Sequence, residues 1–226
     1  MKALLCSLLV FLALSACSGK NKSIAPTINV SEFDGISIKE NQGYADLALS
    51  GYEFRNVDGK TIVYHTCPEA TGAKESEIAE FEFFRYRLLL NSCQALKIYQ
   101  TAKASAASYF PVSFDATLVN EMPATSVPLL NKSQEVARIG KTVKSYFVKG
   151  QLTQEKNGSV KLITDDDEIR YTLLARGDFT NDGVEDLLVR SEWYARKANG
   201  KHVDLLLLTK AAKDKPTTIE WRLMKN

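Results

Sequence analysis

The stretch 178–186 has the composition and spacing of a loop that binds a cation. Side-chain oxygens occur at its first, third, fifth and ninth positions, and Gly183 is the sixth. A hard cation such as Ca²⁺ takes about six to eight oxygen ligands, and a short loop supplies them by wrapping around the ion. Gly183 permits the sharp turn because it lacks a Cβ. We therefore expect a Ca²⁺ site whose ligands are Asp178, Thr180, Asp182, the backbone carbonyl of Val184, and Asp186.

The spacing is similar to the calcium loops of FG-GAP and related extracellular repeats, typically G-D-x-[ND]-x-D-G-x-x-D-L, and to the first half of an EF-hand loop. The sequence departs from both patterns. Thr180 stands where the repeats have Asn or Asp, and Val189 stands where an EF-hand has a bidentate Glu. The resemblance implies a loop between two strands and a structural ion of modest affinity. A propeller would need several copies, and the sequence has one.

The alternative is an acidic β-turn without a metal, because Asn181-Asp182-Gly183 is a good turn sequence by itself. Against it, three carboxylates would be crowded into one small loop, and like charges repel at short range unless a cation offsets them. The acidic turn 165–168 is not added to the site. The predicted strand 169–176 is roughly 26 Å long at about 3.3 Å per residue, so it separates the two acidic segments.

The N-terminus has the features of an export signal. The apolar run 3–14 follows a single lysine and is too short to span a bilayer as a stable helix. It leads into the tetrapeptide 14–17, Leu-Ser-Ala-Cys, which resembles the lipobox of bacterial lipoproteins. That resemblance implies removal of residues 1–16 and lipidation of Cys17 with several acyl chains, which anchor a protein stably. Ser18, where inner-membrane retention typically uses Asp, favours the outer membrane. An ordinary secretory signal is the alternative.

The rest of the chain has the composition of a globular domain. Its hydrophobic fraction of 45% is ordinary. The formal net charge of +2 falls to about +1 when Lys2 leaves with the signal, so no basic field is available to hold nucleic acid. We expect a lipidated tether over residues 17–30, followed by a single globular α+β domain over residues 31–226.

Cysteine usage predicts one disulfide. Cys6 leaves with the signal and Cys17 carries the lipid, so Cys67 and Cys93 remain as an even pair in an oxidising compartment. Their bond would close a loop of about 26 residues and stabilise the fold by roughly 3 kcal/mol in the chain-entropy model. The alternative is a pair of buried free thiols.

The predicted elements form an α+β fold that is predominantly an antiparallel β meander with one long helix. Apolar residues three and four apart predict the helix over residues 85–103, with Phe84 and Cys93 on its buried face. Ahead of it, Asp58-Gly59 predicts a hairpin. We also expect strands at 36–38 and 44–49, a short strand near 112–114, and a short helix over 135–145 that ends or breaks near Gly140.

Six strands are expected in the last eighty residues, with Asn-Gly pairs at two of the turns. The continuous apolar run 205–208 predicts a strand that is buried on both faces. The predicted strands are 146–152, 159–164, 169–176, 186–196, 203–209 and 217–223.

No catalytic fingerprint occurs in the sequence, and the two histidines lack a metal-binding spacing. The lipobox, the cysteine pair and the single late calcium loop together resemble a type of bacterial lipoprotein, and this resemblance implies no activity. We therefore expect an outer-membrane lipoprotein on the periplasmic side, with a structural Ca²⁺, that acts as a binding or envelope-interaction module for a protein or a glycan. The alternatives are an inhibitor or accessory protein of an envelope enzyme such as lysozyme, and a carboxylate-based peptidoglycan or carbohydrate hydrolase.

Overall fold

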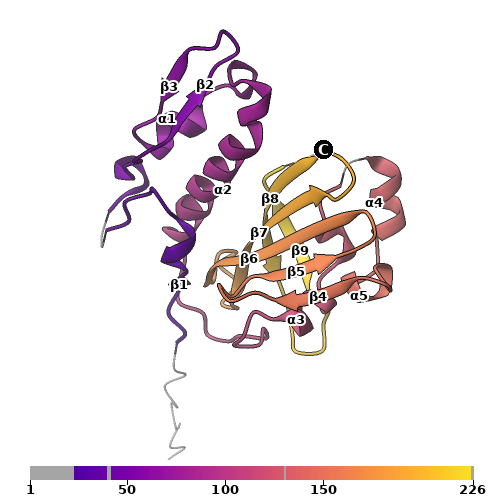
Figure 1. Ribbon diagram of the computed structural model, residues 1–226. Helices are drawn as coiled ribbons and strands as arrows, with labels where there is room; N and C mark the ends of the chain where they lie inside the picture. Colours follow the sequence, from indigo (N-terminus) through magenta and orange to yellow (C-terminus); the bar gives the residue numbers. More distant parts are fainter. Residues whose placement is uncertain (1–22, 40–41, 130, 225–226) are drawn as a thin grey trace, which may run out of the picture.

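The computed structural model describes residues 23–39, 42–129 and 131–224. The fold class is α+β, with a large antiparallel sheet of seven strands (Figure 1). Six strands pair with their neighbours in chain order, and the short strand β1 (Thr27–Ile28) pairs with β6 beyond the end of β5. The six are β4 (Gln151–Gln154), β5 (Val160–Ile163), β6 (Asp167–Gly177), β7 (Asp186–Ala195), β8 (Lys201–Thr209) and β9 (Thr218–Arg222).

Both faces of the sheet are buried where β8 crosses it. Successive side chains of a strand point to opposite faces. Leu205 and Leu207 accordingly join one hydrophobic cluster, whereas Leu206 and Leu208 join a second cluster on the opposite face. The prediction of a doubly buried strand at 205–208 is confirmed. The first cluster contains the long helix α2, and the second contains the short helices α3 (Ala116–Glu121) and α5 (Val143–Tyr146).

Helix α2 (Phe83–Tyr99) overlaps the predicted helix over 85–103, but it begins two residues earlier and ends before residue 103, and Cys93 is buried as predicted. Tyr86, Leu89, Cys93 and Leu96 are buried at spacings of three and four. Phe84 is only half-buried, because Tyr86 occupies the core and donates its hydroxyl proton to the carbonyl of Ala70 at 2.7 Å. The buried face was therefore predicted about half a turn out of phase at the N-terminal end of the helix.

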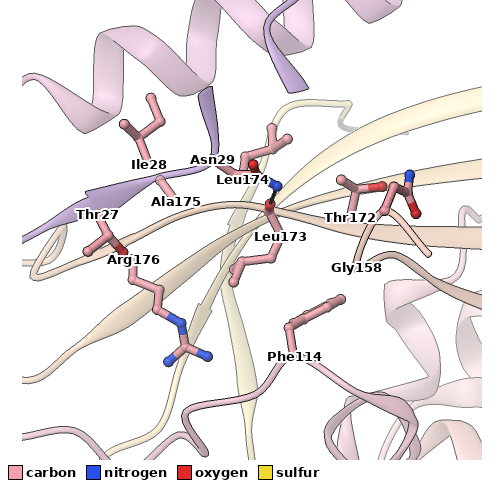
Figure 2. A pocket seen from close by; sticks show the side chains of 11 residues that line it. Thr27, Ile28, Asn29, Phe114, Gly158, Thr172, Leu173, Leu174, Ala175 and Arg176 are labelled. Carbon is pink, nitrogen blue, oxygen red and sulfur yellow. Dashed lines mark hydrogen bonds between the residues drawn. The ribbon is translucent and has the colours of Figure 1, made fainter. Parts of the chain in front are cut away.

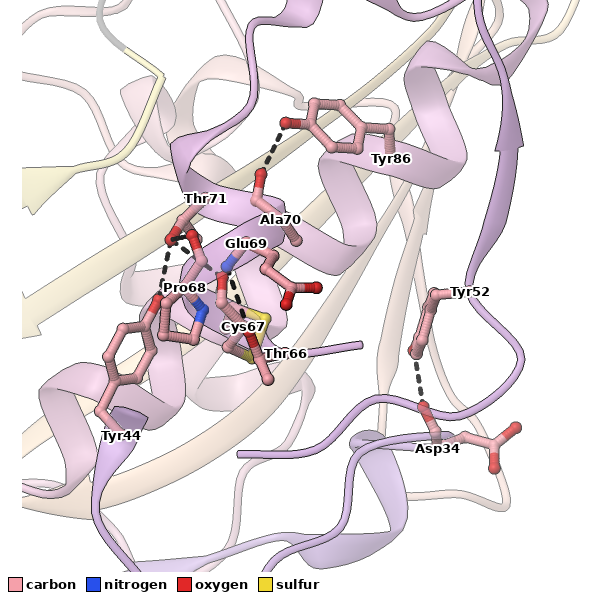
Figure 3. Close-up of a disulfide and its surroundings, with 11 residues drawn as sticks. Asp34, Tyr44, Tyr52, Thr66, Cys67, Pro68, Glu69, Ala70, Thr71 and Tyr86 are labelled. Carbon is pink, nitrogen blue, oxygen red and sulfur yellow. Dashed lines mark hydrogen bonds between the residues drawn. A yellow bond between two sulfur atoms is a disulfide. The ribbon is translucent and has the colours of Figure 1, made fainter. Parts of the chain in front are cut away.

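A disulfide joins α2 to the segment before it (Figure 3). Cys67 opens helix α1 (Cys67–Gly72) and bonds to Cys93 in the middle of α2, with the two Cα atoms 5.4 Å apart. This confirms the predicted pairing. The predicted hairpin is also present, as strands β2 (Glu53–Arg55) and β3 (Thr61–Val63). Together with α1 it packs at one end of α2 (Figure 1).

Several local predictions are wrong. Residues 36–38 and 44–49 form isolated bridges and a 3-10 turn (Tyr44–Asp46) instead of strands, because their backbone pairs one residue at a time with separate neighbours. Residues 112–114 do not form a strand, and residues 112 and 113 form a bend. The predicted helix over 135–145 is two helices, α4 (Lys132–Arg138) and α5, separated at Gly140, whose φ of 73° breaks the helix.

The lipidation site Cys17 and the signal segment 1–16 lie outside the described residues. Part of the predicted tether belongs to the fold: Ile24 pairs with Ser105, and Thr27–Ile28 forms β1 against the end of β6. Within the described ranges, no helix has the length and apolar character needed to cross a membrane.

Candidate metal centre in the loop 178–186

The predicted loop joins the end of β6 to the start of β7, so it connects two antiparallel strands. A segment that follows α2 covers it. The amide of Lys103 donates to the carbonyl of Asp178 at 3.1 Å, and the amide of Ala106 donates to the carbonyl of Gly183 at 2.7 Å. In the other direction, the backbone amide of Glu185 donates to the carbonyl of Ala107 at 2.9 Å. The loop is therefore held by backbone bonds from a neighbour about 75 residues earlier in the chain.

Asp178 is 3% exposed, and its carboxylate accepts hydrogen bonds from inside the loop. Its two oxygens accept the amide protons of Asp182 at 3.1 Å and Gly183 at 3.0 Å. Gly183 has a φ of 85°, in the left-handed region that glycine adopts without strain. The backbone turns sharply at this glycine, as predicted for the sixth loop position, and the turn directs its amide toward Asp178.

Asp186 is the most deeply buried of the predicted ligands, at 1% exposure. One carboxylate oxygen, Oδ2, accepts the amide protons of Phe179 and Thr180 at 2.9 and 3.0 Å and the hydroxyl proton of Thr180 at 3.1 Å. The other oxygen, Oδ1, is buried and has no hydrogen-bond partner among the described residues. An ionised oxygen without a partner in this environment is costly.

Burial raises the pKa of Asp186 from its ordinary value to about 6. The hydrogen bonds from Thr180 and Phe179 act in the opposite direction, and the negative charge of Asp182 adds to the rise. A bound cation would favour the ionised form and reverse this effect.

Of the remaining predicted ligands, Thr180 and Val184 are half-buried and only Asp182 is exposed. The Oδ1 atom of Asp182 accepts the amide proton of Val184 at 2.8 Å. Thr180 donates its hydroxyl proton to Asp186, which leaves the lone pairs of its oxygen free for a further partner. The structure thus places Asp178 and Asp186 under the loop and Asp182 at its surface.

The donor set fits a hard cation, although the carboxylates are directed at loop amides rather than at one common point. No three Asp, Glu, His or Cys side chains in the described ranges converge as a ready metal centre. An ionised carboxylate has about four lone-pair sites, so the two amides accepted by Asp178 leave room for a cation. The oxygen atoms available, together with the unpartnered Oδ1 of Asp186, suit Ca²⁺.

A buried ion pair beside the loop was not predicted from the sequence. Glu185, next to Asp186, is 5% exposed and pairs with Arg176 of β6 at 3.0 Å. Its Oε2 also accepts the hydroxyl proton of Ser108 at 2.7 Å. Glu185 therefore joins the strand, the loop and the segment after α2 and is not a ligand. In the sequence, the only signal for this ion pair is that Arg176 directly follows the apolar run 173–175.

A cavity of about 320 Å³ lies farther along β6, between β1 and the β4–β5 turn (Figure 2). Asn29 spans one side of it and donates its amide proton to the carbonyl of Leu174 at 2.8 Å. Arg176 is the charged residue among those lining it, and its guanidinium is already bonded to Glu185 and to the carbonyls of Pro111 and Val112. The cavity thus offers little free polar chemistry to a ligand.

Comparison with known protein families, curated proteins and solved structures finds no match for this chain.

Proposed function

We propose that this chain is an outer-membrane lipoprotein that binds a structural Ca²⁺ in the loop 178–186 and acts as a binding or envelope-interaction module. The observation that carries the calcium proposal is the unpartnered, buried Oδ1 of Asp186 in a loop with calcium-loop spacing. The lipobox ending at Cys17 supports the anchor. The disulfide supports an oxidising compartment, where such bonds persist.

Asp178, Thr180, Asp182, Asp186 and the Val184 carbonyl would hold the ion. When bound, Ca²⁺ would supply positive charge that offsets the three carboxylates. The loop joins the two longest strands, so the ion would hold β6 and β7 together at this end of the sheet. Its role would be structural.

Calorimetric titration of the full chain with Ca²⁺ tests the metal. We expect one site with a dissociation constant on the order of 10⁻⁵–10⁻³ M, as in extracellular modules. Mg²⁺ should bind much more weakly, because the smaller ion requires near-octahedral geometry. Equal binding of Mg²⁺, or no heat from either ion, would contradict the proposal.

Replacement of the lipidated cysteine tests the anchor. The Cys17→Ser variant should remain unlipidated and unprocessed, and it should no longer fractionate with the outer membrane as a mature lipoprotein. Wild-type chain in the same cells is the control. If the variant still reaches the outer membrane, the lipid is not the anchor.

A further inference from the structure

A second cavity, of about 550 Å³, is lined in part by Ser108 and Pro111, which bond to the ion pair formed by Glu185 and Arg176. Three segments that are distant in the sequence line it: residues 108–111, helix α3, and the connection between β8 and β9. Its floor is apolar, because Phe110 and Leu118 are buried there. The volume is within the range of about 300–1,000 Å³ that holds small ligands in proteins.

Two lysines from the β8–β9 connection give this cavity its charge. The side chain of Lys210 is 12% exposed, and its carboxylate partner, Glu121, is 3.9 Å away and itself 61% exposed. That distance is too long for a hydrogen bond, so the half-buried ammonium is only loosely compensated. Lys213 is exposed and has no ion pair or side-chain hydrogen bond within the described ranges. The lining therefore carries two positive charges and one negative charge.

One wall of the cavity is held in place before any ligand arrives. Ser108 is bonded to Glu185 at 2.7 Å, and Arg176 donates to the carbonyl of Pro111 at 2.8 Å. A wall fixed in this way loses little conformational entropy on binding, which favours affinity. The hydroxyl of Ser108 can still accept a hydrogen bond from a ligand while it donates to Glu185.

The balance of charge selects the kind of anion. A phosphate monoester carries a charge of about −1.5 to −2, which exceeds the net +1 of the lining, and Glu121 would repel it more strongly than it repels a carboxylate. A single carboxylate matches the net charge of the lining. The apolar floor and the hydroxyls of Ser108 and Thr117 suit a compact body with both apolar and polar surface.

We propose that this cavity binds a small monocarboxylate, through Lys210 and Lys213, with its body against Phe110 and Leu118. The proposal rests on the proposed binding function and names its ligand chemistry. Such a carboxylate belongs to two sources in an envelope, an acidic sugar or the C-terminus of a short peptide. The lysines would recognise the carboxylate in either case.

The test is calorimetric titration of the full chain in mild detergent with two pairs of probes. D-glucuronate is compared with D-glucose, and dialanine with its C-terminal amide, because the members of each pair differ at the carboxylate. We expect millimolar binding of one or both acids and no binding of glucose or the dipeptide amide, which lack the carboxylate. Selective binding of glucuronate identifies the sugar source, and selective binding of dialanine identifies the peptide source.

Variants then locate the site. Lys213→Gln should weaken binding of the acid about fivefold, the effect of one moderately strong ion pair. Lys215→Gln, in the same connection but outside the lining, should change it by less than about twofold. Glu121→Gln should tighten binding, because it removes the repelling charge. Lys210→Gln should weaken it further, and Lys213, being exposed, keeps the test valid if the Lys210 variant does not fold.

The titrations are run in EGTA as well as in Ca²⁺, and the proposal requires carboxylate-selective binding in at least one condition. A chain that fails to bind calcium therefore does not decide the question. Equal binding by the probes with and without a carboxylate would overturn the proposal. So would the absence of binding in both conditions, or equal effects of the Lys213 and Lys215 variants.

Discussion

The two ends of strand β6 are both acidic, yet they differ in burial and in what compensates their charge. At its start, Asp166 is 74% exposed and pairs with Lys197 at 2.8 Å. At its end, Asp186 of the adjoining strand is 1% exposed and accepts three hydrogen bonds on one oxygen and none on the other. Acidic composition alone therefore does not distinguish the two segments. Burial without a compensating positive charge is what distinguishes the loop 178–186.

The pKa values of the two carboxyls shift in opposite directions, because their surroundings differ. The hydrogen bond and charge of Lys197 lower the pKa of Asp166. Burial raises the pKa of Asp186 to about 6. The exposed carboxyl is stabilised as an anion, whereas the buried one is destabilised as an anion unless a cation binds.

The largest difference should appear when each side chain is truncated. Asp186→Ala removes the acceptor of three loop hydrogen bonds, and we expect a loss of about 3 kcal/mol in the free energy of unfolding. Asp166→Ala should lower the urea midpoint only slightly, because an exposed ion pair contributes little. Urea unfolding in EGTA measures both variants. Equal losses would show that the loop is no more than another acidic turn.

Variants at the two ends of β6 should also differ in how much Ca²⁺ stabilises them, and this difference should be smaller than the one caused by truncation. At a hundredfold excess over its dissociation constant, Ca²⁺ would stabilise the chain by about 2.7 kcal/mol, or several degrees in melting temperature. Asp182→Asn should abolish most of this shift. The change keeps an oxygen that can accept the Val184 amide but removes the charge.

Asp166→Asn is the matched control, with the same chemical change at the opposite end of β6, and its calcium shift should equal that of the wild type. Glu185 is unsuitable as a control, since its removal would leave Arg176 buried without its carboxylate partner. Equal calcium shifts in the Asp182 and Asp166 variants would mean that the ion binds elsewhere.

The pH dependence should sharpen the comparison. The pKa of Asp186 is higher in the folded chain than the ordinary value, so its contribution to stability is greatest at acid pH and is lost as the pH rises through about 6. Calcium competes with this proton. The calcium-induced rise in melting temperature should therefore be larger at pH 7.5 than at pH 5.0. A calcium shift that is independent of pH would exclude Asp186 as a ligand.

The smallest effect concerns salt at the exposed end. The Asp166–Lys197 pair should contribute a slight stabilisation that disappears in 0.5 M NaCl, since the screening length is then only a few ångströms (about 10 Å at 0.1 M). The destabilisation caused by Asp186→Ala should persist in the same salt, because its hydrogen bonds are buried. Urea midpoints at low and high salt test this. A salt-sensitive loss at Asp186 would place its interactions at the surface.

Local features of this protein could be predicted from the sequence because they depend on near neighbours. The loop between β6 and β7 follows from the spacing of Asp178, Gly183 and Asp186, and the hairpin β2–β3 follows from Asp58-Gly59. The disulfide followed from elimination, since the inferred processing leaves only Cys67 and Cys93. The burial of Cys93 in α2 was predicted correctly, but in the first turn Tyr86 enters the core where Phe84 was expected, because the apolar pattern does not say which aromatic side chain reaches the core.

Only the tertiary structure decided which side chains are buried and which segments, distant in the sequence, lie next to each other. The sequence shows that there are carboxylates at both ends of β6. It does not show that Asp186 is buried or that it accepts the amide protons of Phe179 and Thr180. Nor does it show that residues 108–111 meet Lys210, about a hundred residues later, around one cavity. Turn and strand geometry is set by a few adjacent residues, whereas solvation and charge compensation depend on groups that only the folded chain brings together.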